Sequence, residues 1–150
     1  MDPVGTTASI ITLIVTIATV AESLQNIYDR WRNAPHHVRA LAALLLSIKA
    51  RLDLLQHIST NGHSLIIDPT SGHKLDGLLE QARKCIEQSR AILERVQRHG
   101  DYQMRAMWTV RESRRVDRTM ERLRDVEYGL SRWTETLLLY EIDFFPCAFQ

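Results

Sequence analysis

Residues Val4–Ala21 read VGTTASIITLIVTIATVA, a stretch without a charged side chain that lies between Asp2 and Glu22. As an α-helix the stretch is about 27 Å long, close to the ~30 Å hydrocarbon core of a bilayer. A segment this apolar must either be covered by protein or inserted into lipid. Length and composition alone fit both environments.

Two patterns run along this helix. Large apolar side chains recur at alternating spacings of four and three, which places them on one face: Ile10, Ile14, Ile17, Ala21, Leu24, Tyr28 and Trp31. Hydroxyl side chains follow the same rhythm on another face: Ser9, Thr12, Thr16, Thr19 and Ser23. Ile11 and Val15 flank the hydroxyls on the far side, so we expect a helix that contacts two neighbours in a bundle. In lipid, the hydroxyl stripe would instead turn towards a pore or another helix.

The candidate membrane-inserting residues are the large apolar side chains of this segment. They are Val4, Ile10, Ile11, Leu13, Ile14, Val15, Ile17 and Val20. A bundle that covers them in one state and releases them in another would be bistable. Because burial at ~25 cal/mol per Å² makes release costly, a partner or an oligomer contact must offset it.

The remaining sequence predicts further helices with short connections. Asp2-Pro3 is typical of a helix start, and Pro35 ends the first helix near Trp31. Apolar side chains at helical spacing predict three more helices: His36–His57, Lys74–Arg98 and Val116–Tyr140. The last has an expected inner face of Val116, Met120, Leu123, Leu130, Trp133, Leu137 and Tyr140.

The predicted breaks are marked by turn residues. Ser59–His73 contains Asn-Gly, Asp-Pro and Ser-Gly and is expected to be a loop, with Leu65–Ile67 packed against the bundle. His99-Gly100-Asp101 ends or kinks the third helix, and the following charged segment is the least regular part. The sequence therefore predicts an all-α fold, a four- to five-helix bundle with a long apolar N-terminal helix. We expect residues 1–150 to form one domain, which can stand at the front of a longer protein.

Charge is unevenly distributed along the chain. The net charge is +1, yet twelve Lys and Arg residues against six acidic ones lie between Arg83 and Arg124. The candidates for contact with anionic lipid are Arg105, Arg111, Arg114, Arg115, Arg118 and Arg122. The alternative is a solvated helix face neutralised by Glu112, Asp117 and Glu121. Nucleic-acid binding is not expected, because no base-stacking set accompanies the arginines.

Other functional classes find little support. No phosphate-binding glycine loop, nucleophile elbow or HExxH motif is present, so we do not expect an enzyme, a cofactor or a metal site. Two cysteines indicate a reduced, cytoplasmic chain, with Cys85 a small buried residue. Trp31, Trp108 and Trp133 are expected to be packing anchors. Trp31, at the end of the first helix, also suits a lipid interface.

Three segments together resemble a known group of domains. The first is the MDPxG…SII opening with its uncharged helix. The second is NAPHHVRALAALLLSIKARLDLLQ at Asn33–Gln56, and the third is Trp108 followed by a charged run and MERLRDVEYGLSRWTETL at Met120–Leu137. Over roughly Met1–Leu139 the chain resembles the fungal HeLo-like N-terminal domains of STAND and NLR-type proteins.

The resemblance implies a membrane-active cell-death domain. It implies a cytoplasmic bundle, held inactive by downstream receptor modules, that self-associates and moves to the plasma membrane on activation. There Val4–Ala21 would engage or permeabilise the bilayer. The alternative is a soluble signalling or oligomerisation adaptor whose first helix stays permanently in the core.

Overall fold

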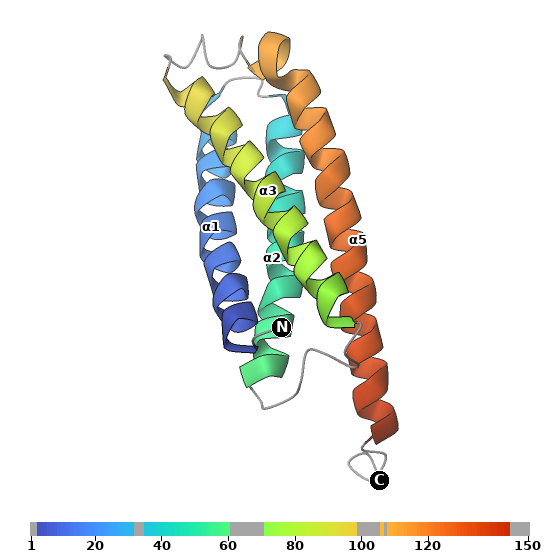
Figure 1. The fold of residues 1–150 in the computed structure, drawn as a ribbon. Coiled ribbons are helices and arrows are strands. Elements are labelled where there is room, and N and C mark those ends of the chain that lie inside the picture. Colours follow the sequence, from blue (N-terminus) through green and yellow to red (C-terminus); the bar gives the residue numbers. More distant parts are fainter. Residues whose placement is uncertain (1–2, 32–34, 61–70, 99–105, 107, 145–150) are drawn as a thin grey trace.

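The computed structural model describes residues 3–31, 35–60, 71–98, 106 and 108–144, and this part of the chain is all-α, as predicted. Its elements are four α-helices and one π-helical turn: α1 Pro3–Arg30, α2 His36–Thr60, α3 Ser71–Gln97, η1 Trp108–Glu112 and α5 Ser113–Phe144. Consecutive α-helices run in opposite directions, and α3 crosses the bundle at an incline (Figure 1).

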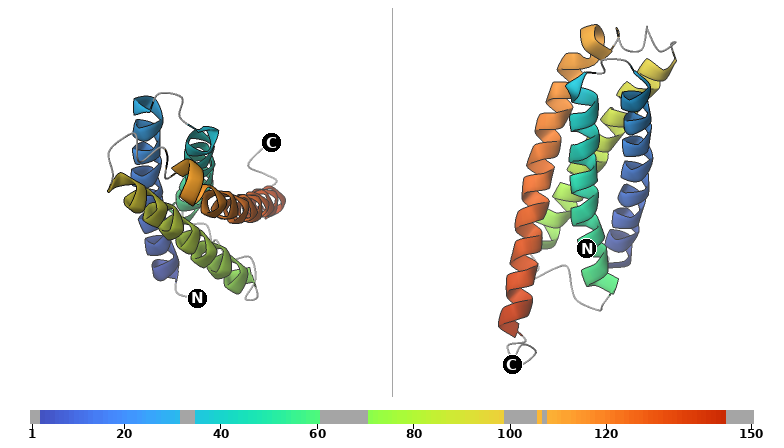
Figure 2. Two further views of the ribbon diagram at one scale, coloured as in Figure 1. Left: turned by 90° about the horizontal axis from the view of Figure 1, so that it is seen from above. Right: turned by 180° about the vertical axis from the view of Figure 1, so that it is seen from behind.

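Each outer helix packs against the same two neighbours. α1 contacts α2 and α3, and α5 also contacts α2 and α3. α1 and α5 therefore lie on opposite sides of the bundle, with α2 and α3 between them (Figure 2). The last turns of α5 extend past the ends of the other helices (Figures 1 and 2). The expectation that the first helix touches two neighbours is confirmed.

The core is built from the inner faces of all four helices. On α1, Ile10, Ile17 and Leu24 are fully buried, while Ile14 and Tyr28 are half-buried against the core. A second buried stripe on α1 lies beside the expected face: Leu13, Val20 and Ile27. The expected inner face of the last helix is buried from Val116 to Leu137, with Trp133 half-buried. Tyr140 lies outside the side chains that the structure describes.

Several helix ends differ from the sequence expectation. α2 continues through Ser59 and Thr60, and α3 begins at Ser71, so the expected loop Ser59–His73 is shorter at both ends. Thr60 Oγ1 donates a hydrogen bond to the carbonyl of Gln56 at 2.8 Å within the last turn of α2. Leu65–Ile67 lies outside the described residues.

The charged segment before the last helix is helical, in contrast to the expectation of an irregular stretch. α5 begins at Ser113 and continues to Phe144, and the π-helical turn η1 precedes it. The buried positions Trp108, Glu112 and Val116 are four residues apart, so the inner face of α5 extends back through η1. The expectation is wrong because a glutamate stands in that apolar series and hides its helical period.

A glycine allows α3 and α5 to approach closely. A Cβ atom at Gly129 of α5 would lie 2.5 Å from Leu78 Cδ2 of α3. The end of the Leu78 side chain would therefore have to shift for a larger residue at position 129. Arginines line the region of the α3–α5 contact nearer η1.

Candidate functional site

The outward face of α1 carries no charge over its first four turns. Ile11 is 42% exposed and Val15 is 60% exposed, and Ala8, Thr12 and Thr19 share this face. α1 is long and apolar enough to cross a membrane, with a mean hydropathy of 1.8 over its best window, yet only 33% of that window is buried. An entirely internal core helix would be covered on all sides. α1 instead presents an uncharged, partly apolar surface to solvent.

The threonine hydroxyls on α1 are bonded within the helix itself. Thr12, Thr16 and Thr19 donate to the carbonyl oxygens of the residues four positions earlier, at 2.9, 2.9 and 3.1 Å. Their O–H groups are therefore satisfied by α1 alone. This matters because an unsatisfied polar group in hydrocarbon costs several kcal/mol. The transfer of these three hydroxyl groups into lipid therefore costs less free energy than the transfer of unbonded hydroxyl groups would.

The structure divides the eight membrane-inserting candidates between two faces. Four are buried in the bundle: Ile10, Leu13, Ile17 and Val20. Ile14 is half-buried, whereas Ile11 and Val15 are exposed. The side chain of Val4 lies outside those that the structure describes. Insertion of the whole set therefore requires α1 to leave α2 and α3.

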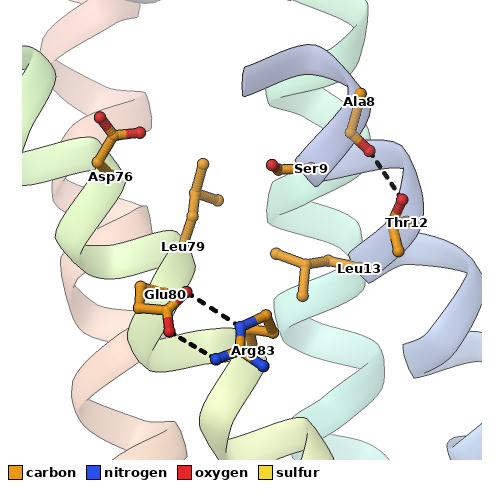
Figure 3. A pocket seen from close by; sticks show the side chains of 8 residues that line it. All are labelled: Ala8, Ser9, Thr12, Leu13, Asp76, Leu79, Glu80 and Arg83. Atoms are coloured by element: carbon orange, nitrogen blue, oxygen red, sulfur yellow. Dashed lines mark hydrogen bonds and ion pairs between the residues drawn. The ribbon is translucent and has the colours of Figure 1, made fainter. Parts of the chain in front are cut away.

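A groove of about 500 Å³ separates the first turns of α1 from α3. Ser9 and Leu13 of α1 face Leu79 and Arg83 of α3 across it (Figure 3). Arg83 binds Glu80 on its own helix through hydrogen bonds of 2.6 and 3.0 Å, and these bonds are the main cause of the lowered pKa of Glu80.

A second, smaller groove lies between α3 and α5 and is lined by arginines. Its volume is about 210 Å³. Arg95 and Gln88 come from α3, and Arg115, Arg118 and Arg122 come from α5. Ile92 and the buried Thr119 also line it. Arg122 Nη1 donates to Gln88 Oε1 at 3.3 Å, which joins the two helices across the groove.

The buried side chain of Glu112 binds two of these arginines. Its side chain is only 2% exposed. Arg95 Nε donates to Glu112 Oε1 at 3.0 Å, and Arg115 Nη1 donates to the same oxygen at 3.3 Å. Burial tends to raise the pKa of Glu112, but the hydrogen bonds and charges of Arg95 and Arg115 outweigh it and lower the pKa. Glu112 thus fixes the α3 and α5 sides of the groove with one buried carboxylate.

The structure brings together only part of the arginine cluster expected from sequence. Arg115, Arg118 and Arg122 line the groove, whereas Arg111 and Arg114 are exposed outside it. Arg105 lies outside the described residues. Asp117, which is expected from sequence to neutralise the arginines, instead lies 3.3 Å from His37 Nε2 of α2. No described ion pair involves Glu121.

Sequence reasoning missed two features of this arrangement. Arg95 belongs to the preceding helix, so its position along the chain does not group it with the later arginines. Glu112 is expected from sequence to be a surface partner, although its spacing of four from both Trp108 and Val116 places it on the inner stripe. That spacing was the available signal for its burial.

Glu112→Gln is expected to destabilise the bundle by about 1–3 kcal/mol, because two guanidinium groups lose their carboxylate. A lowered pKa in the folded state means that ionised Glu112 stabilises the fold above the unfolded-state value of about 4.5. That stabilisation is lost as pH falls through the lower folded value. Urea unfolding from neutral to acidic pH tests both points. The variant should show a smaller acid-induced loss than the parent, and identical pH profiles would contradict the assignment.

Two tryptophans join α1 to the start of α5. Trp31 and Trp108 are 5% and 0% exposed, and their rings meet edge to face with centroids 6.4 Å apart. Their packing role is confirmed. Both indole N–H groups are buried without a hydrogen-bond partner among the described residues, and Trp108 opens a π-helical turn. Such turns are rare and occur mostly as single-turn bulges within α-helices.

No group of metal-ligating side chains was found among the described residues. Cys85 is buried, as expected, and its burial raises the pKa of the thiol. A scan against protein-family models and searches of curated proteins and of solved structures found no match to this chain. The structure is an all-α bundle whose first helix is apolar and long enough to span a membrane. A groove lined by arginines lies between α3 and α5, on the side of the bundle away from α1.

Proposed function

We propose that this chain is a membrane-targeting effector bundle whose first helix leaves the core and engages the bilayer. In the fuller form implied by its resemblance to HeLo-like domains, it is a cytoplasmic cell-death domain that self-associates at the plasma membrane, under control of receptor modules. One observation carries the proposal. The only described helix that meets the length and hydropathy of a membrane span is also covered over just 33% of that span.

The polar groups of α1 favour the same conclusion. Its backbone is helical from Pro3 to Arg30, so most of its N–H and C=O groups are paired within the segment. Three of its threonine hydroxyls are also bonded internally. A segment that satisfies its own hydrogen bonds can move from protein to lipid without leaving polar groups unpaired.

The energetics of release favour self-association. Burial of a large apolar side chain contributes roughly 1.5–3 kcal/mol, and α1 buries six such side chains: Ile10, Leu13, Ile17, Val20, Leu24 and Ile27. Lipid can cover α1 itself after insertion. It cannot cover the matching faces of α2 and α3 that α1 leaves behind. In this proposal, contact with further copies of the chain buries those faces of α2 and α3.

A reversible lock on α1 tests the release step. Thr7 Oγ1 of α1 and Ser59 Oγ of α2 are 3.2 Å apart, so cysteines at these two positions are placed for a disulfide. With Cys147 replaced by serine, the oxidised Thr7→Cys/Ser59→Cys protein is expected to leave dye-loaded vesicles of phosphatidylcholine and phosphatidylserine intact. Addition of reductant should start leakage.

Each single cysteine variant serves as the control and should leak with or without reductant. Leakage from the oxidised, locked protein equal to that of the reduced protein would contradict release of α1. If no form binds or permeabilises the vesicles, the adaptor interpretation replaces the proposal, with α1 a permanent part of the core.

A further inference from the structure

We propose that the groove between α3 and α5 is a binding site for a phosphate-bearing anion, held by Arg118 and Arg122 from α5 and by Arg95 from α3. The ligand class is a phosphomonoester or pyrophosphate group. This inference extends the proposed membrane function, because such groups occur on lipid headgroups as well as in free phosphates. The binding itself does not require α1 to move.

The charges of the groove are not balanced by the described part of the protein. Four guanidinium groups line it, and the one carboxylate they contact is Glu112. Arg118 makes no ion pair with a described residue, and Arg122 is bonded only to the neutral amide of Gln88. Asp117, next to Arg118, lies 3.3 Å from His37 Nε2 of α2, and Glu121 and Asp125 form no described ion pair with these arginines. The four guanidinium groups therefore share one carboxylate partner among the described residues.

The geometry suits a polyvalent oxyanion more than scattered counterions. The groove has a volume of about 210 Å³ and is open to solvent on one side. Guanidinium groups present parallel N–H donors that match the oxygens of phosphate, and charge-assisted bonds of this kind are the strong ones. Donors converge from both helices, and the buried Thr119 lines the same groove.

Glu112 pre-organises this set of donors. Because it binds Arg95 and Arg115 at once, it holds an α3 guanidinium beside the α5 series. Arg118 and Arg122 are four residues apart and lie on one face of α5. The Arg122–Gln88 bond is the one groove contact that an arriving anion displaces, and it joins a cation to a neutral acceptor.

Two double variants separate a defined site from general attraction to positive charge. Arg118→Gln/Arg122→Gln removes the two α5 arginines that have no acidic partner in the groove. Arg114→Gln/Arg124→Gln removes the same charge from exposed positions on α5 that do not line it. Calorimetric titration of the intact chain with pyrophosphate should give saturable binding. We expect at least about tenfold weaker binding in the groove variant and less than about twofold in the control.

Vesicle co-sedimentation then identifies the source of the phosphate. Phosphatidylcholine vesicles are compared with vesicles that also contain phosphatidic acid or phosphatidylserine. Preference for phosphatidic acid that is lost in the groove variant assigns a lipid headgroup, and binding of pyrophosphate without that preference assigns a free phosphate compound. Equal loss in both double variants, or no saturable binding of either probe, overturns the site. Since pyrophosphate requires no membrane, failure here is distinguishable from failure of α1 insertion.

Discussion

Replacement of Val15 by aspartate is expected to abolish membrane permeabilisation while the bundle remains folded. Val15 lies midway along the uncharged stretch of α1 and is 60% exposed, so a carboxylate at this position remains in water in the folded state. In the inserted state the same carboxylate would lie near the centre of the bilayer. A charged residue there costs about 2.5–3.5 kcal/mol on insertion scales, which is on the order of 100-fold in the insertion equilibrium.

The measurement combines dye leakage from anionic vesicles with thermal unfolding of the same protein. Val15→Thr is the matched control, since it changes polarity without adding charge and should retain most of the leakage. Ile17→Asp provides the contrast, because Ile17 is fully buried and its replacement should unfold the bundle. If Val15→Asp keeps both its fold and full leakage activity, the insertion hypothesis is wrong.

Truncation of Trp108 to alanine is expected to destabilise the bundle more than loss of the Glu112 carboxylate does. The indole is completely buried, and its edge-to-face contact with Trp31 joins η1 to the end of α1. Removal of a buried aromatic side chain from a core typically costs about 3–5 kcal/mol. For a chain of this size, that corresponds to a fall of roughly 10 °C in the unfolding temperature.

Two controls isolate the cause of this loss. Trp108→Phe keeps an aromatic ring and removes an N–H group that has no partner in the described part of the chain, so its cost should be much smaller. Trp133→Ala removes a half-buried ring and should also cost less than Trp108→Ala. Calorimetry gives the ranking directly. A Trp108→Ala protein as stable as the parent would show that the two tryptophans do not hold η1 against α1.

Much of the fold could be predicted because helical periodicity is a local property. The side chains at Val38, Leu41, Leu45, Ile48, Leu52 and Leu55 recur at spacings of three and four, and every one of them is buried. Helix ends do not follow from this periodicity. Ser59, Thr60 and Ser71 belong to helices, although their residue types also favour turns. Residue preference is a weak guide at helix ends, because tertiary context can override it.

The candidate sites were predicted less completely. The apolar first helix and its hydroxyl stripe were evident from spacing, but which of its apolar residues stay exposed was not. That division depends on where α2 and α3 lie, and it leaves Ile11 and Val15 facing solvent. The arginine cluster was evident as a run of charge along α5. Its division into groove and non-groove members depends on α3, which supplies Arg95 and Gln88.

The all-α class, the helical spans within a few residues and the uncharged length of α1 all follow from residue type and spacing along one segment. The burial of Glu112, the approach of Arg95 to the α5 arginines and the covering of a third of the α1 span follow only from the packing of the helices. The physical reason is that burial and charge pairing are set by side chains from different helices, whose juxtaposition depends on how those helices cross.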